Sequence, residues 1–526
     1  MKAGRVIDGD EHDARTLAQH LVADARAEAA KVESAVKVLA ESILAAARTE
    51  AERITARAQA DAAKLRDDAR QLAHELVAPL RHAGDPPAVT ATATTTVRMS
   101  KLELELEQAE PGRVDEVIGL VVRATVPGAA FGELVRIDSQ PRPIAAEVVG
   151  FRGEQALLLP LGDLAGVSPA SAVWRTGEAL AILAGDDLLG RALDGLGAPI
   201  DGGAALTGER WAVDRAAPPA LERPRITAPL ATGVRAIDAM LTLGRGQRVG
   251  LFAAAGVGKT TLLGQIARGT SADVIVVCQV GERGRELAEL LGDELAPARA
   301  KTVVVCATSD APPLVRLRAV HVATAISEWF RDQRGASVLL LVDSLTRVAR
   351  AQREVGLSTG EPPARHGYPP SVFALLPRLI ERAGATAAGA ITAIYTVLVA
   401  GNDLDEPIAD EVRGLVDGHI VLDRRLAQRG HFPPIDVVAS VSRLMHRVTD
   451  PRHAEAAAAL RARLAVYEDH RDLITLGAYQ PGRDRVLDRA VEAYPAIEGL
   501  LRQSREEHAE WHQVLDQLSL LATGSR

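Results

Sequence analysis

Cysteine is scarce in this chain, with two residues in a sequence of 526. Both lie in apolar runs, Cys278 in VIVVCQV and Cys306 in KTVVVCA, and thiols in such runs are usually buried. This placement predicts two buried thiols on neighbouring strands rather than a disulfide, which fits a reducing compartment. We therefore expect a cytoplasmic protein that is not held together by disulfides.

Signals for secretion, nucleic-acid binding and membrane insertion are also weak or missing. The first residues, MKAGRVIDGDEHDAR, lack the apolar core of a signal peptide, and a net charge of −8 provides no basic surface for nucleic acid. The uncharged stretch from Gly384 to Gly401 begins with small residues and ends with β-branched ones. We interpret it as a helix end, a turn and a buried parallel strand, and we expect no transmembrane segment.

Glycine and proline are absent from residues 11–78, a segment dense in Ala, Glu, Arg and Leu. This composition predicts a long helix, and its apolar positions repeat about every 3.7 residues, a period that favours straight or slightly right-handed helix pairing. We expect residues 1–84 to form an amphipathic interaction arm. A solvated helix that packs on its own protein body remains the alternative. Residues 85–96 have the composition of a linker.

The rest of the chain divides by its hydrophobic pattern, and 526 residues exceed what one core supports. Short alternating runs such as GELVRID and AAEVVGF predict a small antiparallel β-barrel over residues 97–185. Residues 186–445 alternate buried strands with helices, which is typical of a parallel, doubly wound α/β domain. Residues 446–526 show helical spacing only. The strands expected in the α/β domain are RVGLF, DVIVVCQV, TVVVCA, SVLLLVD, ITAIYTVLV and GHIVL.

A glycine-rich turn stands between the first of these strands and a helix. It reads Ala253-Ala254-Ala255-Gly256-Val257-Gly258-Lys259-Thr260, with Ala253 where the phosphate-binding P-loop pattern has glycine. Backbone N–H groups of such a turn point at a phosphate, and the helix N-terminus adds its positive end. We expect Lys259 to reach the β- and γ-phosphates and the Thr260 hydroxyl to ligate Mg²⁺. The residues expected to bind ATP here are Gly256, Val257, Gly258, Lys259, Thr260 and Thr261.

Two acidic residues end other strands of the same sheet. Asp343 ends SVLLLVD, where it is suited to hold Mg²⁺ through water, although a simple strand-end residue is the alternative. Glu282, in VGERGRE, is placed to deprotonate the attacking water, with Arg283 holding charge nearby. Spacing alone leaves open that Glu282 only complements a helix N-terminus.

Phosphoryl transfer also needs positive charge on the departing phosphate, and an arginine from a neighbouring subunit can supply it. Arg443, in ASVSR, follows the last expected sheet segment. Spacing alone does not distinguish it from other arginines.

Longer segments resemble a known family, the flagellar and injectisome type III secretion ATPases, which are related to the α and β subunits of F-type ATP synthase. The resemblance runs from about Arg113 to Gln503 and implies a RecA-like core. It rests on GQRVGLFAAAGVGKT, VIVVCQVGERGRE, DSLTRVARAQREVGLSTGEPPARHGYPPSVFALLPRLIERAG, YTVLVAGNDLDEPIADEVRGLVDGHIVLDR, HFPPIDVVASVSR and LITLGAYQPGRD.

The resemblance implies roles for single residues. Glu282 is similar to the catalytic glutamate, Arg443 to the arginine finger given in trans, and Asp343 to the Walker B aspartate. Phe432 stands where the family places an adenine-stacking aromatic residue, and Arg347 and Tyr368 fall in segments that line the catalytic interface.

The resemblance also implies an assembly. We expect a homohexamer around a central coiled-coil stalk protein, with a peripheral stator protein, chaperone–substrate complexes and a membrane export gate as further partners. The implied location is the cytoplasm, at the inner face of the cell membrane. The arm at residues 1–84 resembles the peripheral-stalk helices that bind such ATPases, so part of a stator is a candidate for fusion here.

Some positions depart from the family pattern. The family usually has Gly and Ser where this chain has Ala254 and Ala255, and often Glu and Asp at the positions of Ala400 and Asn402. None of these changes removes a group that transfers a proton or phosphate. The extra Cβ at Ala254 is expected to restrict the loop and alter turnover.

Three other functions compete with the export motor. A catalytic subunit of an ion-translocating ATP synthase is disfavoured because the C-terminal region lacks a DELSEED-type acidic loop and because one chain carries both Glu282 and Arg443. A ring component that only binds nucleotide is disfavoured by the intact Lys259, Glu282 and Asp343, although the AAAG loop leaves this alternative open. A RecA-like helicase would need more stacking aromatics than the barrel offers, which are Phe131, Phe151 and Trp174.

Overall fold

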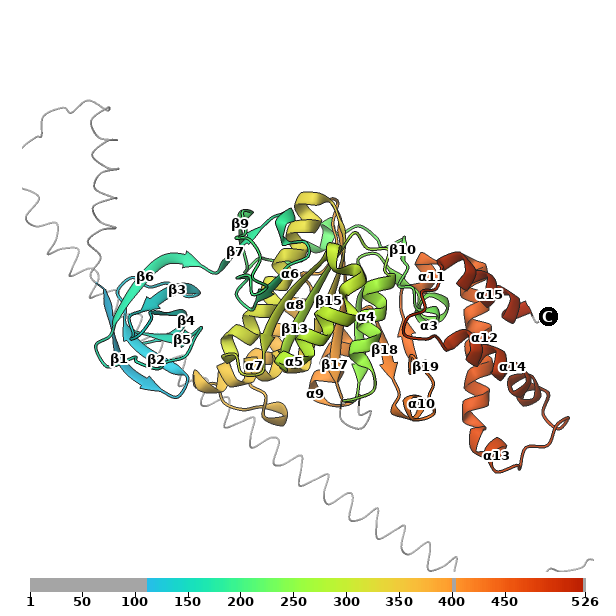
Figure 1. The fold of residues 1–526 in the computed structure, drawn as a ribbon. Coiled ribbons are helices and arrows are strands. Elements are labelled where there is room, and N and C mark those ends of the chain that lie inside the picture. Colours follow the sequence, from blue (N-terminus) through green and yellow to red (C-terminus); the bar gives the residue numbers. More distant parts are fainter. Residues whose placement is uncertain (1–110, 400–403, 524–526) are drawn as a thin grey trace, which may run out of the picture. The chain divides into compact units, whose positions relative to one another are not determined.

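The computed structural model describes residues 111–399 and 404–523 (Figure 1). The predicted arm at residues 1–84 and the linker at 85–96 lie outside these residues, as do Ala400 and Asn402.

Short alternating strands at the start of the described chain close into an antiparallel barrel. Its strand order is β1-β2-β5-β4-β3-β6, and Val122, Val148 and Leu158 are fully buried inside it. The run VDEVIGLVVRATV forms two strands rather than one, because Gly119 turns the chain with φ of +58°. The closing strand β6 lacks an alternating pattern, since only Val173 in it is buried. The strands are β1 (Gly112–Ile118), β2 (Val121–Thr125), β3 (Glu133–Ile137), β4 (Ile144–Arg152), β5 (Gln155–Pro160) and β6 (Ala172–Ala179).

The central sheet contains all six strands expected from the apolar runs, each parallel to its neighbours among them. The order is β19-β18-β12-β17-β15-β13-β14-β8, with β16 pairing beside β17. The strands are β8 (Ala192–Asp194), β12 (Arg248–Ala253), β13 (Val274–Glu282), β14 (Thr302–Thr308), β15 (Ser337–Asp343), β16 (Gly384–Ala385), β17 (Ala390–Leu398), β18 (Gly418–Leu422) and β19 (Ile435–Ser442). Strand β19 runs antiparallel to β18 and forms one edge.

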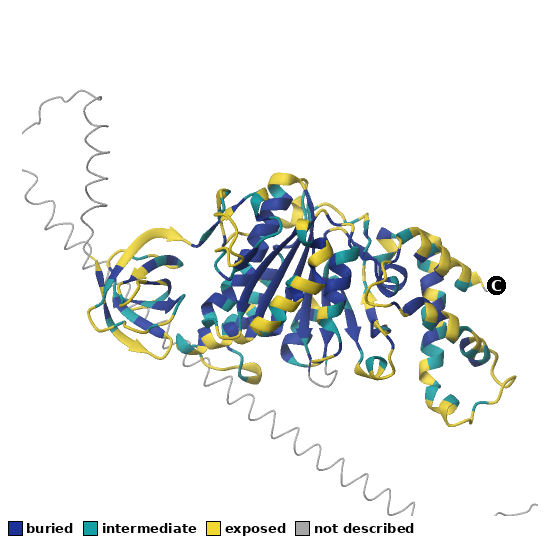
Figure 2. Cartoon of the chain, in the orientation of Figure 1, coloured by how far each residue is buried: buried dark blue, intermediate teal, exposed yellow. Residues whose placement is uncertain are grey.

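Helices cover both faces of this sheet, so its strands are buried on both sides (Figure 2). Val276 and Cys278 of β13 belong to the same hydrophobic cluster as α6, α7 and α8, whereas Ile275 and Val277 belong to the cluster of α3 and α4. This arrangement confirms the doubly wound α/β prediction. The helices of the domain are α3 (Arg235–Met240), α4 (Lys259–Gly269), α5 (Gly284–Glu289), α6 (Pro313–Arg334), α7 (Leu345–Ser358), α8 (Pro370–Ile380), α9 (Pro407–Leu415) and α10 (Arg424–Gln428).

After β19 the described chain is helical, as predicted. Helix α12 packs against both α14 and α15. The helices are α11 (Met445–Val448), α12 (Pro451–Asp469), α13 (Arg471–Thr475), α14 (Arg485–Leu501) and α15 (Trp511–Thr523). Two small antiparallel pairs lie between β6 and β12 in sequence, formed by β7 (Ala181–Ala184) with β9 (Glu209–Ala212) and by β10 (Pro229–Leu230) with β11 (Leu243–Gly244).

Two predictions about apolar runs can be compared with the structure. Cys278 and Cys306 are buried free thiols on the neighbouring strands β13 and β14, and burial raises the pKa of Cys306 to about 11. The stretch from Gly384 contains the buried strand β17, but the expected helix end there is wrong: α8 stops at Ile380, and the small residues form β16 and a turn. Among the described residues, no helix is long and apolar enough to cross a membrane.

Candidate active site

The glycine-rich turn joins β12 to α4. Ala254 and Val257 are buried in the cluster that contains Leu262 of α4, which fixes the loop against its helix. Gly256 and Gly258 have φ of +77° and +96°, values that favour glycine. No side chain caps the N-terminus of α4, so its N–H groups are available to an anion. The turn therefore has the geometry of a phosphate-binding loop.

The alanines of this loop occupy different environments. Ala254 is 4% exposed, so its methyl group packs in the hydrophobic cluster, whereas Ala255 is exposed. Thr260 is exposed in the first turn of α4, and Thr261 follows it, half-buried.

Lys259 meets both predicted acidic residues at the carboxyl edge of the sheet. Its ammonium forms an ion pair with Asp343 Oδ1 and lies 3.7 Å from Glu282 Oε1. The side chains of Lys259, Glu282 and Asp343 are 11%, 12% and 1% exposed. These residues meet because β12, β13 and β15 are parallel and end at the same edge.

Arg347 of α7 orients Glu282. Its Nη2 donates to Glu282 Oε2 at 2.8 Å, and its Nη1 donates to the carbonyl of Gly281. Burial raises the pKa of Glu282 to about 7, a hydrogen bond with Glu286 adds to the rise, and Lys259 and Arg347 oppose it. Such a carboxyl group can exchange a proton near neutral pH.

The alternative role of Glu282, complementing the positive end of a helix, falls instead to Glu286. Glu282 is the last residue of β13, whereas Glu286 stands in the first turn of α5. Glu286 is therefore the acid that complements the helix N-terminus.

The structure does not bring Arg283 into this cluster. Its side chain is 77% exposed, and the acid it approaches is Glu286, at 3.9 Å. Arg347 is the arginine that contacts Glu282, and the segment DSLTR was its only signal in the sequence. Tyr368 stands beside Arg353, whose guanidinium lies 5.7 Å from its ring.

Thr396 of β17 is a site residue that sequence reasoning missed. Its hydroxyl donates to Asp343 Oδ1 at 2.8 Å and so holds the carboxylate in place. Its only signal was that it is one of two threonines in the largely apolar run AITAIYTVLV.

Phe432 and Arg443 flank β19 in the sequence, so they lie near its opposite ends. Phe432 precedes the strand and is 50% exposed. Arg443 follows it, and Ser442 pairs with Gly418, the first residue of β18. Because β18 is parallel to β12, Arg443 lies at the amino end of these strands, whereas Lys259 follows their carboxyl end. One chain therefore does not bring Arg443 to its own phosphate-binding loop.

Comparison with known proteins agrees with this geometry. The nucleotide-binding domain of the ATP synthase alpha/beta family matches residues 233–442, its beta-barrel domain matches 114–177, and the C-terminal domain of EscN-type T3SS ATPases matches 449–519. The flagellum-specific ATP synthase of Treponema pallidum is 49% identical over 80% of this chain and 96% of its own length. The type 3 secretion system ATPase of Xanthomonas euvesicatoria is 46% identical over 81% of this chain and 98% of its own.

The chain belongs to this family of export ATPases. The assembled ATPase EscN of enteropathogenic E. coli has a TM-score of 0.74 and 42% identity, and the match covers 78% of this chain and all of that one. EscN in complex with its central stalk EscO gives a TM-score of 0.73. This export ATPase thus binds and hydrolyses nucleotide for type III protein secretion, and the ATP synthase alternative is not supported.

Proposed function

We propose that this export ATPase works as a homohexamer, with each catalytic site shared between two copies. One copy supplies the phosphate-binding loop, Lys259, Glu282 and Asp343, and its neighbour supplies Arg443. The observation that carries this proposal is the separation of Arg443 from its own Lys259 by the length of β12. The assembled state of EscN, 42% identical, supports the ring.

Within the shared site each side chain has a distinct task. Lys259 binds the β- and γ-phosphates when it leaves its ion pair with Asp343. Glu282, oriented by Arg347, accepts the proton of the attacking water. Arg443 of the next copy neutralises charge on the departing phosphate, and Phe432 stacks on the adenine.

The residues present fit a Mg²⁺ ion bound together with ATP. A hydroxyl from Thr260 and a carboxylate from Asp343, which would hold the ion through water, are hard oxygen groups, and the ammonium of Lys259 already pairs with this carboxylate. The 1% exposed carboxylate is kept in place by Thr396. When bound, Mg²⁺ would neutralise phosphate charge.

The proposed hexamer also implies binding partners. We infer a central stalk protein, as in the EscN–EscO complex, and also a stator protein, chaperone–substrate complexes and a membrane export gate at the cytoplasmic face. The predicted arm is the candidate contact with the stator. Deleting residues 1–84 should weaken stator binding while leaving ATP hydrolysis in place, and unchanged binding in a pull-down assay would refute this role.

Mixed rings test the shared site. Lys259→Ala removes the phosphate ligand and Arg443→Ala removes the trans arginine, so each variant alone should be inactive. In a randomly mixed 1:1 ring, about a quarter of the interfaces pair an intact pocket with an intact arginine. Phosphate release by the mixture should therefore exceed that of either variant alone. Absence of any recovery in rings shown to contain both variants would refute the proposal.

A further inference from the structure

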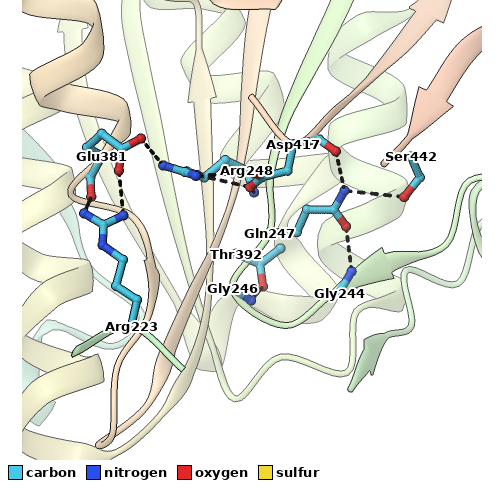
Figure 3. A network of polar contacts seen from close by, with 9 residues as sticks. All are labelled: Arg223, Gly244, Gly246, Gln247, Arg248, Glu381, Thr392, Asp417 and Ser442. Atoms are coloured by element: carbon cyan, nitrogen blue, oxygen red, sulfur yellow. Dashed lines mark hydrogen bonds and ion pairs between the residues drawn. The ribbon is translucent and has the colours of Figure 1, made fainter. Parts of the chain in front are cut away.

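A polar network ties together the amino ends of the central strands (Figure 3). Arg248, the first residue of β12, donates from its backbone N and from Nε to Asp417 Oδ2, at 3.0 and 3.1 Å. Its Nη1 donates to Glu381 Oε1 at 2.5 Å, and Arg223 binds the other oxygen of Glu381 at 2.6 Å. The guanidinium of Arg248 is thus held between two carboxylates.

Gln247 extends the network toward β19. It is fully buried, and its Oε1 accepts from the N–H of Gly244 at 2.8 Å. Its Nε2 donates to the carbonyl of Asp417 at 3.3 Å and to Ser442 Oγ at 3.4 Å. The Ser442 hydroxyl in turn donates to the carbonyl of Thr242 at 2.9 Å. A buried amide whose hydrogen-bonding groups are all used fixes the segments it joins.

Strands β18 and β19 approach this amide closely at Gly418. A Cβ at Gly418 would lie 2.6 Å from the carbonyl oxygen of Val441 and 3.2 Å from Gln247 Nε2. Glycine at this position therefore lets β18 and β19 close tightly on Gln247.

The network ends at Arg443. The backbone N–H of Arg443 donates to the carbonyl of Asp417 at 3.1 Å, the same oxygen that accepts from Gln247. The residue itself is exposed, and its Nη2 is 3.4 Å from the carbonyl of Arg413. Its backbone is therefore held while its guanidinium faces outward.

We propose that Gln247 and Asp417 are positioning residues for Arg443, and that Arg248 holds Asp417 in the required place. This inference rests on the proposed role of Arg443 in a neighbouring site. It adds that the arginine offered to the next copy is fixed to β12, the six-residue strand whose other end carries the phosphate-binding loop of the same copy.

Gln247→Met tests the inference, because it removes both hydrogen-bonding ends at similar volume and adds no charge. A displacement of about 1 Å at a catalytic group costs up to about 100-fold in rate. We expect kcat to fall about 10- to 100-fold while the Kd of a fluorescent ATP analogue changes less than about threefold. Asp417→Asn, which weakens the hold of Arg248, should show the same pattern and replaces Gln247→Met if that variant does not fold. Arg223→Gln is the matched control, since it breaks a contact of the same network on the far side of Glu381 and should leave kcat within about threefold.

Mixed rings then show which copy is damaged. If Gln247 acts through Arg443, the Gln247→Met pocket remains intact, so mixing with Lys259→Ala should restore phosphate release above the sum of the separate samples. Mixing Gln247→Met with Arg443→Ala should restore nothing. The reverse pattern would mean that Gln247 supports its own phosphate-binding loop, and it would overturn the inference.

The mixed-ring experiments also distinguish an error in the shared-site proposal from an error in the positioning role of Gln247. If Lys259→Ala and Arg443→Ala do not complement each other, the shared site is wrong. If they do, but Gln247→Met and Asp417→Asn keep wild-type kcat, only the positioning role is wrong.

Discussion

The two ends of the central sheet handle charge in different ways. At the carboxyl end, Lys259, Glu282 and Asp343 are at most 12% exposed and compensate one another. At the amino end, Arg248 and its acids are also paired, but Arg443 beyond them is exposed. The carboxyl end thus holds a buried set of paired charges, whereas the amino end exposes a cation. On the function that we propose, phosphoryl transfer takes place at the carboxyl end, and the arginine at the amino end completes the site of the next copy.

Replacing the proposed base should produce the largest effect at the carboxyl end. Glu282→Gln keeps an acceptor for Arg347 but cannot take a proton, so kcat should fall about 10²- to 10⁴-fold with nucleotide affinity retained. Phosphate release by assembled protein and binding of a fluorescent ATP analogue measure the two quantities. Hydrolysis at the wild-type rate would mean that the carboxyl end holds nucleotide without cleaving it.

At the amino end, the expected loss is one of stability. Arg248→Ala leaves Asp417 and Glu381, whose side chains are 25% and 41% exposed, without their shared guanidinium. Because both carboxylates remain partly exposed to water, which solvates their charge, we expect the free energy of unfolding to fall by only about 1–3 kcal/mol. Urea denaturation measures this change, and a loss under about 0.5 kcal/mol would show that the network contributes little to folding.

The pH dependence of kcat/KM should come from the carboxyl end. The pKa of Glu282 is raised to about 7, chiefly by burial. A general base acts only when deprotonated, so kcat/KM should fall about tenfold per unit as pH drops below 7 and level off above it. Glu286→Ala removes the hydrogen bond that raises this pKa, so the falling limb should move to lower pH. A profile unchanged in this variant would argue against Glu282 as the titrating group.

The smallest effect is expected for Arg283, although the sequence suggested a catalytic role for it. Its side chain is 77% exposed and outside the ion-pair cluster, so Arg283→Ala should change kcat less than about twofold. Arg347→Ala is the comparison, because Arg347 contacts Glu282 directly and its loss should be far larger. Equal losses in the two variants would place Arg283 in the site after all.

The contrast between Arg283 and Arg347 shows what the sequence could predict. The strands and the phosphate-binding loop were predictable because buried apolar runs and glycines report on the local chain. The acids at strand ends followed from parallel topology. Adjacent residues at a strand end point in different directions, however, so spacing could not show that Glu282 faces Lys259 while Arg283 faces solvent.

Contacts between segments far apart in the sequence could not be predicted either. Gln247 and Asp417 are separated by 170 positions, and the motif GQR gives no sign that its amide reaches toward β19. Thr396 escaped notice for the same reason, since its partner Asp343 is 53 positions away. Such pairs form only when the sheet brings separate strands side by side.

Strand β12 has one further consequence. It is hydrogen-bonded to β17 on one side and β18 on the other, so it cannot stretch or slip by itself. A shift of the phosphate-binding loop would therefore be transmitted along the strand to its amino end, where Gln247 and Arg248 bind Asp417. In a closed ring with shared sites, nucleotide binding in one copy would then displace the arginine offered to its neighbour, so the coupling between sites would run in one direction around the ring.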